Sequence, residues 1–196
     1  MIIGIDYGSK LAGTTVVSIY NPSSYQVRQF QSEKGKDADK FVLEQVKSGD
    51  QKVSIFIDAP LSLPKVYSHK SLVTDEYFYR ACDKELKAMS PMFLGGLTAR
   101  AIKLTRSLES LGAQVFETYP GALAKELELI KHSYKKEKEN ISLVLDQLLA
   151  TFPVQLKESP QNWHQVDSLL AVISGIRHTN NEAQRIGDPL EGVIVF

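Results

Sequence analysis

The sequence has little of what marks secreted, membrane-embedded or strongly charged proteins. It contains a single cysteine, Cys82, which excludes an internal disulfide framework and favours a reducing compartment. No uninterrupted apolar run approaches the roughly 20 residues that cross a bilayer. The charged Asp6 follows "MIIGI" directly, unlike the long apolar core of a signal peptide. These absences predict a cytoplasmic protein with no membrane partner.

An excess of charge of one sign is also missing. The 23 lysine and arginine residues equal the 23 aspartate and glutamate residues, so the net charge singles out no class of partner. This balance is mildly unfavourable to a dedicated nucleic-acid binder, whose binding face is usually basic. The length of 196 residues suits one domain with a normal hydrophobic core, and no internal repeat or low-complexity linker divides it. We therefore predict a single domain over residues 1–196.

The hydrophobic pattern predicts an alternation of strands and helices. Strands are expected over residues 1–6, 13–20, 25–31, 52–58 and 113–120, with 191–196 as a short edge strand. Helices are expected over residues 37–47 (with Gly49 as the stop), 74–89, 97–112, 121–130, from about 141 to 149, and 162–178. Short turns join the first three strands, so they should pair as an antiparallel meander.

The order of these elements is that of the ribonuclease H fold. In that fold three antiparallel strands precede a helix, and the fourth strand lies parallel to the first. We therefore predict an α/β protein with a mixed five-stranded sheet flanked by helices. A helical insertion is expected after the fourth strand, at about residues 68–96. A fold-level pattern of this kind says little about function by itself.

Two carboxylates stand where predicted strands end. Asp6 ends the first strand and Asp58 ends the fourth, so parallel pairing would place both at the sheet edge where α/β proteins bind ligands. Carboxylates this close repel each other unless a cation lies between them or one is protonated. Oxygen ligands without clusters of histidine or cysteine suit Mg²⁺ or Mn²⁺. Two such ions about 4 Å apart can cleave a phosphodiester bond.

Further acidic groups should reach the same edge. His164 and Asp167 are three residues apart on a predicted helix and share one of its faces, while Glu117 lies in the end portion of the fifth strand, within "FETYP". Each residue also has a structural interpretation. An aspartate before a glycine caps a turn, and an acid near a helix start interacts favourably with the helix dipole. The convergence of several segments on one edge favours a metal site.

A set of motifs resembles a known family. In chain order they are "GIDYGSKLAG", "IDAPLSLP", "YRACDKELKAM", "ETYPGAL" and "WHQVDSLLAVISG". Over nearly the whole chain they resemble domain-of-unknown-function family 429, predicted nucleases with a ribonuclease H-like fold. The first and last motifs are also similar to those of RuvC-like Holliday-junction resolvases, in which the insertion has no counterpart. The resemblance implies three metal-binding acids, with two further candidates: Asp6, Asp58 and Asp167, then His164 and Glu117. Arg80 and Asp83 match the family's R-x-x-D without an evident role.

Basic residues form the candidate nucleic-acid surface. Arg100, Lys103 and Arg106 recur every three residues on one predicted helix, and such a stripe neutralises phosphates. Exposed helix faces also carry lysine and arginine without any ligand. A second patch lies within residues 131–138, and residues 77–79 offer three aromatic rings for stacking on bases.

The sequence thus predicts a divalent-metal-dependent nuclease that hydrolyses phosphodiester bonds. In this hypothesis Asp6 bridges two Mg²⁺ or Mn²⁺ ions, Asp58 and Asp167 hold one each, and Lys10 steadies the scissile phosphate. One alternative is a nucleotide-binding or phosphotransfer protein of the actin and sugar-kinase type, whose D-x-G loop also follows a first strand. Another is a ribonuclease H-like binding module without turnover. The choice between DNA and RNA stays open, as does a homodimer.

Overall fold

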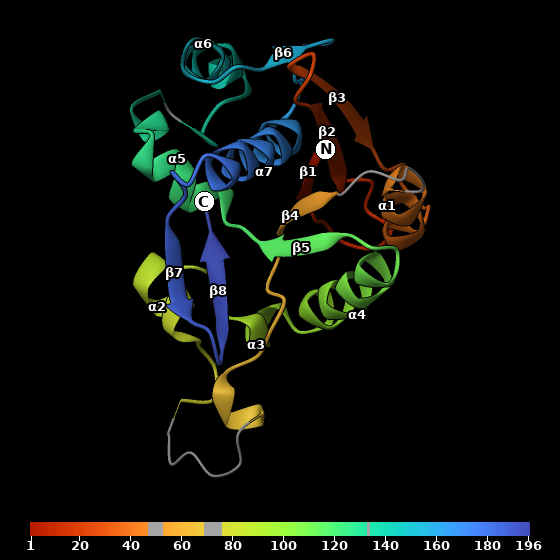
Figure 1. Ribbon diagram of the computed structural model, residues 1–196, viewed down its shortest axis with the longest axis vertical. Helices are drawn as coiled ribbons and strands as arrows, with labels where there is room; N and C mark the ends of the chain where they lie inside the picture. The colour runs from red at the N-terminus through yellow and green to blue at the C-terminus, as the bar shows by residue number, and fades with distance from the viewer. Residues whose placement is uncertain (47–52, 69–75, 133) are drawn as a thin grey trace.

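The computed structural model describes residues 1–46, 53–68, 76–132 and 134–196, which form an α/β fold around one mixed sheet of eight strands (Figure 1). In spatial order the strands are β6 (Gln155–Leu156), β3 (Gln26–Gln31), β2 (Val16–Asn21), β1 (Ile2–Asp6), β4 (Ser54–Asp58), β5 (Gln114–Glu117), β8 (Gly192–Val195) and β7 (Arg185–Asp188). The seven α-helices in this part of the chain are α1 (Ala38–Val46), α2 (Ala81–Leu86), α3 (Pro91–Leu94), α4 (Gly96–Ser110), α5 (Pro120–Glu126), α6 (Ile141–Thr151) and α7 (Trp163–Thr179). The predicted α/β class is confirmed.

The first four strands pair as the sequence predicts. β1, β2 and β3 form an antiparallel meander, and β1 lies parallel to β4. Every residue of β1 is buried, as expected for a strand covered on both faces. In the β1–β4 register Asp6 stands opposite Asp58. The two carboxylates therefore leave neighbouring strands at the same level.

The prediction of five strands is wrong, because the described residues contain eight. β6 and β7 were not predicted, since two and four residues of mixed polarity are too short to show an alternating pattern. The C-terminal strand β8 was expected at an edge. It instead lies between β5, to which it is parallel, and β7, to which it is antiparallel. The C-terminal hairpin thus extends the sheet beyond β5.

Helices cover both faces of the sheet, and α7 packs closest. α7 lies across β1, β2 and β4 on one face, while α1 and α4 cover the other (Figure 1). A Cβ at Gly4 of β1 would lie 2.3 Å from the Ser168 carbonyl oxygen of α7, so the close contact requires glycine. Val166, Leu169 and Ile173 recur at helical spacing, so the sequence predicts one apolar stripe on α7. The structure buries every residue from Val166 to Arg177, because α5 and α6 cover its outer side.

The region after β4 is less helical than predicted. A helix was expected over residues 74–89, of which Thr74 and Asp75 lie outside the described residues, but α2 begins only at Ala81. The Glu76 carboxylate accepts hydrogen bonds from the backbone amides of Phe78 and Tyr79, which makes a turn here. Lys87 ends α2 in the left-handed conformation, at a φ of 55°.

The remaining boundaries differ by a few residues. α5 ends at Glu126, where the sequence predicts a helix to residue 130, and α6 continues to Thr151. The predicted end of the first helix, at Lys47 and Gly49, falls outside the described residues. Within the described ranges no helix is both long enough and apolar enough to cross a bilayer.

Candidate metal centre

Three aspartates from three separate elements meet at the carboxyl end of β1 and β4. Asp6 ends β1, Asp58 ends β4, and Asp167 lies in the second turn of α7. One carboxylate oxygen of each lies within 4.8 Å of those of the other two. Asp6 and Asp167 are buried and Asp58 is partly buried. The prediction that these three acids converge is confirmed, and the acidic triad could hold a metal ion.

The start of α7 fixes the third aspartate. The Asn162 side chain accepts a hydrogen bond from the backbone amide of Gln165, at 3.1 Å, and so caps the helix. The cap sets where the first turn begins, so His164 and Asp167 face the ends of β1 and β4 together. The close packing of α7 on β1 at Gly4 then sets how near Asp167 lies to Asp6.

Asp58 has no partner of its own in the part of the chain that the structure describes. Its carboxylate accepts no hydrogen bond there and pairs with no lysine, arginine or histidine. Burial, followed by the negative charges of Asp6 and Asp167, raises the pKa of Asp58 well above its ordinary value. A divalent cation would relieve this repulsion and supply the missing partner.

Asp6 is paired with the predicted histidine. His164 Nδ1 lies 2.7 Å from Asp6 Oδ2, and the histidine side chain remains almost half exposed. The hydrogen bond to the Asp6 carboxylate raises the pKa of His164, because it favours the charged imidazolium. The structure thus places His164 as a hydrogen-bond partner of Asp6. Its role as a direct metal ligand stays a prediction.

Asp167 is held by two neighbours that the sequence analysis missed as site residues. The Tyr134 hydroxyl donates to Asp167 Oδ1, and Lys135 Nζ lies 2.6 Å from Asp167 Oδ2. Lys135 adopts the left-handed conformation, with a φ of 59°, which is uncommon for lysine. The Tyr134 ring also packs edge-on against Trp163, with centroids 5.4 Å apart. The only signal in the sequence was the patch at residues 131–138, which looked like a solvated basic loop.

The raised pKa of Asp167 gives the metal-free protein a defined pH dependence. Burial raises the pKa of this carboxyl to about 6, although the positive charge of Lys135 lowers it. An aspartate in the unfolded chain has a pKa of about 3.9. The folded state therefore binds this proton more tightly, and its contribution to the free energy of unfolding is lost as the pH rises from about 4 to about 7.

We expect wild type to lose stability relative to Asp167→Asn over that pH range. The measurement is urea denaturation of both proteins in EDTA at several pH values. A difference in unfolding free energy that stays constant from pH 4 to 7 would contradict the raised pKa.

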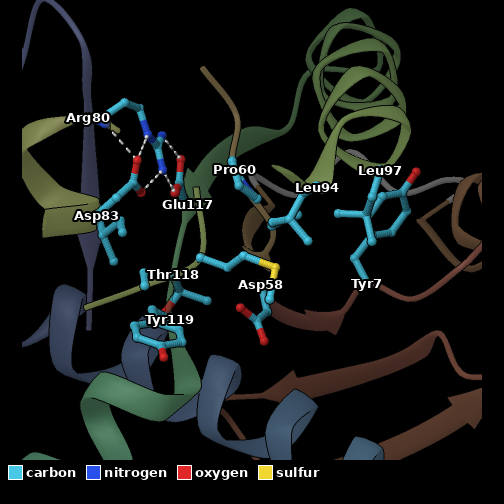
Figure 2. A pocket seen from close by; sticks show the side chains of 14 residues that line it. Tyr7, Asp58, Pro60, Arg80, Asp83, Leu94, Leu97, Glu117, Thr118 and Tyr119 are labelled. Carbon is cyan, nitrogen blue, oxygen red and sulfur yellow. Dashed lines mark hydrogen bonds and ion pairs between the residues drawn. The ribbon is translucent and has the colours of Figure 1, made fainter. Parts of the chain in front are cut away.

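The predicted fourth acid, Glu117, is held by a buried arginine. Arg80 is fully buried, and its guanidinium lies 2.6 and 2.7 Å from the two carboxylate oxygens of Glu117 (Figure 2). It also donates to both oxygens of Asp83, at 2.7 and 3.0 Å, and to Ser62 Oγ at 2.8 Å. Glu117 does not join the group of three aspartates that can share an ion.

This ion network gives Arg80 and Asp83 of the R-x-x-D motif a structural role. Burial alone would lower the pKa of Arg80, but the hydrogen bonds that its guanidinium donates to Glu117 and Asp83 outweigh burial and raise the pKa, so the guanidinium stays charged. The Leu61 backbone amide also donates to Glu117, at 2.9 Å. The network thus ties α2 and the segment after β4 to the end of β5, beside Asp58.

No family model matches the chain, and no curated protein matches it either. The resemblance to family 429 therefore stays a prediction from the motifs, and the function is argued from the geometry of the site.

Two of the four residues predicted to contact phosphate, Lys10 and Arg100, already form ion pairs with aspartates. Lys10 Nζ lies 3.3 Å from Asp37 Oδ2 on a largely exposed side chain. Arg100 forms an ion pair with Asp39, with 2.6 Å between Nη2 and Oδ1. Its guanidinium also lies over the Tyr7 ring, and its Cζ is 4.8 Å from the ring centroid. The other two residues of the stripe, Lys103 and Arg106, are exposed on α4. Their contact with nucleic acid stays a prediction.

A cavity of about 200 Å³ opens beside Asp58. Its apolar and aromatic walls come from the turns that follow β1, β4 and β5, from α3 and α4, and from the segment just before α3. They are formed by Tyr7, Pro60, Met89, Leu94, Leu97 and Tyr119. The Arg80 network closes one end (Figure 2). Asp58 itself lines the cavity, so any group bound in it lies next to the candidate metal centre.

Proposed function

We propose that this protein is a divalent-metal-dependent hydrolase of phosphodiester bonds in nucleic acid. The observation that carries the proposal is the Asp58 carboxylate, partly buried and without a partner among the described residues, beside the carboxylates of Asp6 and Asp167. An arrangement of this kind is costly without a cation, and oxygen ligands alone suit Mg²⁺ or Mn²⁺. The site lies at the carboxyl edge of the sheet, where α/β proteins bind ligands.

The topology supports a ribonuclease H-like assignment. The strand order β3-β2-β1-β4-β5, with an antiparallel meander and a parallel β1–β4–β5 arrangement, agrees with that fold. β6 on one side and the β8–β7 pair on the other extend the sheet. Together with the motifs, this order supports membership of family 429 and the expectation of nuclease chemistry.

Each protein group at the site has a definable task. Asp6, Asp58 and Asp167 would hold one or two ions, and a bound divalent ion would polarise the phosphate and favour ionisation of the attacking water. His164 orients Asp6 through Nδ1, while Tyr134 and Lys135 orient Asp167. The Lys135 ammonium, which pairs with Asp167, would also add positive charge near a phosphate bound at these ions.

One observation favours a second candidate, a binding module without turnover. The Lys135 ammonium already neutralises Asp167, as a structural ion pair would. However, no lysine or arginine among the described residues pairs with Asp6 or Asp58. The kinase-like alternative has less support, because the Gly8 amide of the D-x-G loop donates to Thr15 Oγ1, at 3.0 Å, and is not free for a phosphate.

Cleavage assays distinguish these candidates. Labelled single-stranded and duplex DNA and RNA are incubated with the protein in Mn²⁺, Mg²⁺ or EDTA. The proposal requires cleavage of at least one substrate that depends on the cation. Binding to nucleic acid with no cleavage in either cation would favour the non-catalytic module.

Lys135 should compete with the metal ion for Asp167. Replacing it by methionine removes a positive charge 2.6 Å from a proposed ligand oxygen, so Mn²⁺ should bind more tightly. Because Lys135 is about half exposed and partly screened, we expect a gain of roughly three- to tenfold in affinity. The measurement is the electron paramagnetic resonance signal of free Mn²⁺ during titration.

The neighbouring exposed lysine provides a matched control. Lys136→Met makes the same change one residue further along the chain and should alter the Mn²⁺ affinity less than Lys135→Met does. Equal or weaker Mn²⁺ binding by Lys135→Met, relative to wild type, would contradict competition between Lys135 and the ion for Asp167.

A further inference from the structure

We infer that the cavity beside Asp58 binds one unpaired nucleobase of a nucleic-acid strand, so that the enzyme selects single-stranded or unpaired substrates. The inference rests on the proposed phosphodiesterase function, because that function places a phosphate at Asp58. In a nucleic-acid strand the base is attached one sugar away from the phosphate. A base in this cavity and a phosphate at the metal centre can therefore belong to neighbouring positions of one strand.

The size of the cavity favours one ring system. Its volume of about 200 Å³ is below the roughly 300–1,000 Å³ of pockets that take drug-sized ligands. A base pair is larger than a single base, and a base inside a duplex is stacked and paired. It would have to leave the helix, at a cost of a few kcal/mol, before it could enter. An unpaired base pays no such cost.

The walls are those of a binding site for a flat apolar ring. In Figure 2 Asp58 lies between Tyr119 on one side and Leu94, Leu97 and Tyr7 on the other. Aromatic and apolar side chains bind bases by stacking, largely without regard to sequence. Neighbouring residues hold both tyrosine rings in place, so the walls are formed before a ligand binds.

Each tyrosine has a specific support. The Tyr7 hydroxyl donates to Asp39 Oδ1 at 2.5 Å, and its ring lies against the Arg100 guanidinium. The Tyr119 ring fills space that only glycine leaves at position 121, because a Cβ there would lie 2.9 Å from Tyr119 Cζ. In this interpretation Arg100 is a positioning residue that acts by holding the Tyr7 ring. The sequence predicts a different role for it, direct contact with phosphates from an exposed helix face.

The polar end of the cavity offers little with which to read one particular base. The Arg80 guanidinium donates to both Asp83 and Glu117, and the Thr118 hydroxyl donates to Ser174 Oγ at 3.0 Å. Sequence readout needs donors and acceptors that are free to pair with a base edge. The Tyr119 hydroxyl is one such group, since it has no hydrogen-bond partner among the described residues. We therefore expect binding with little dependence on base identity.

The segment that contributes Leu94 to the cavity wall also carries exposed aromatic rings. Phe78 and Phe93 stack on each other with centroids 5.5 Å apart, and both are more than half exposed. Phe93 directly precedes Leu94 of the cavity wall. Exposed aromatic pairs of this kind can stack on further unpaired bases. This segment, the predicted helical insertion, would then contribute a surface for single strands.

The test compares strands that differ only in their bases. The probes are a labelled single-stranded oligonucleotide of ten nucleotides, an abasic strand with the same number of phosphates, and the corresponding duplex. Binding is measured by fluorescence anisotropy in Ca²⁺, which keeps a divalent charge in place of Mg²⁺. We expect the single strand to bind about tenfold or more tightly than the abasic strand and the duplex, the scale of one stacked base.

A variant that fills the cavity places the effect at this site. Leu94→Trp should weaken binding of the single strand about tenfold, the scale of one stacked base, while Mn²⁺ binding by electron paramagnetic resonance stays unchanged. Leu143→Trp makes the same change on an exposed position of α6 and should leave both measurements unchanged.

The outcomes separate this inference from the proposed function. Equal, cation-dependent binding of the normal and abasic strands would overturn the base site and leave the metal site standing. Binding that depends on the bases but not on divalent cations would support the base site and contradict the proposed metal-dependent function. Binding of a free mononucleotide as tightly as the strand would also overturn the inference, because the ligand would then be a nucleotide and not a strand.

Discussion

Asp58→Asn is expected to abolish cation-dependent cleavage while leaving a protein that folds normally. The substitution removes one charge from the proposed metal centre and leaves the other two aspartates and their partners in place. Loss of one preorganised charge-stabilising group from an active site typically costs about a hundred- to a thousandfold in rate. We therefore expect the cleavage rate in Mn²⁺ to fall by at least about a hundredfold.

The metal-free stability of the same variant is an internal check. The Asp58 carboxylate repels Asp6 and Asp167 and accepts no hydrogen bond from the described residues, so its removal should not lower the free energy of unfolding in EDTA. Asp146→Asn, an exposed position on α6, is the matched control and should keep full activity. An Asp58→Asn variant that cleaves like wild type would remove Asp58 from the mechanism.

Arg80→Met should be among the most destabilising single substitutions in the described part of the chain. Arg80 is fully buried and pairs with two carboxylates that are also buried. Removal of one partner from a buried ion network leaves charge without compensation, which typically costs about 3–5 kcal/mol. For a chain of this length that cost corresponds to a fall of about 6–20 °C in melting temperature.

Urea and thermal denaturation provide the measurement. Arg106→Met on the exposed face of α4 is the matched control and should change the unfolding free energy by less than about 0.5 kcal/mol. The loss in Arg80→Met should be smaller at pH 5 than at pH 8, because burial raises the pKa of Glu117, which can take up a proton once its arginine partner is gone. A loss below about 1 kcal/mol at pH 8 would contradict the role of Arg80 in joining α2 to β5.

The meeting of Asp6, Asp58 and Asp167 could be predicted from the sequence because strand order and helix periodicity decide it. Asp6 and Asp58 end strands whose patterns indicate parallel neighbours, and their register follows from that pairing. Asp167 lies one turn from His164 on a helix that packs across β1. None of these placements depends on the details of side-chain packing.

Other features depend on contacts that a local pattern does not contain. Tyr134 and Lys135 lie in a charged loop, and only the tertiary structure brings them to Asp167. Arg80 belongs to a motif visible in the sequence, but its role appears only when the end of β5 places Glu117 beside it. α2 begins late because the Glu76 carboxylate binds backbone amides at residues 78 and 79. The short strands β6 and β7 form because neighbouring strands offer free edges.

The most direct test of the central claim is thermal unfolding of wild type and Asp58→Asn in Mn²⁺ and in EDTA. A cation that binds only the folded state, at a hundred times its dissociation constant, should stabilise wild type by about 2.7 kcal/mol. We expect this stabilisation in wild type and its loss in Asp58→Asn, because the unpartnered carboxylate is the proposed reason that the ion binds. Absence of the shift in wild type, or an equal shift in both proteins, would contradict a metal centre at Asp58.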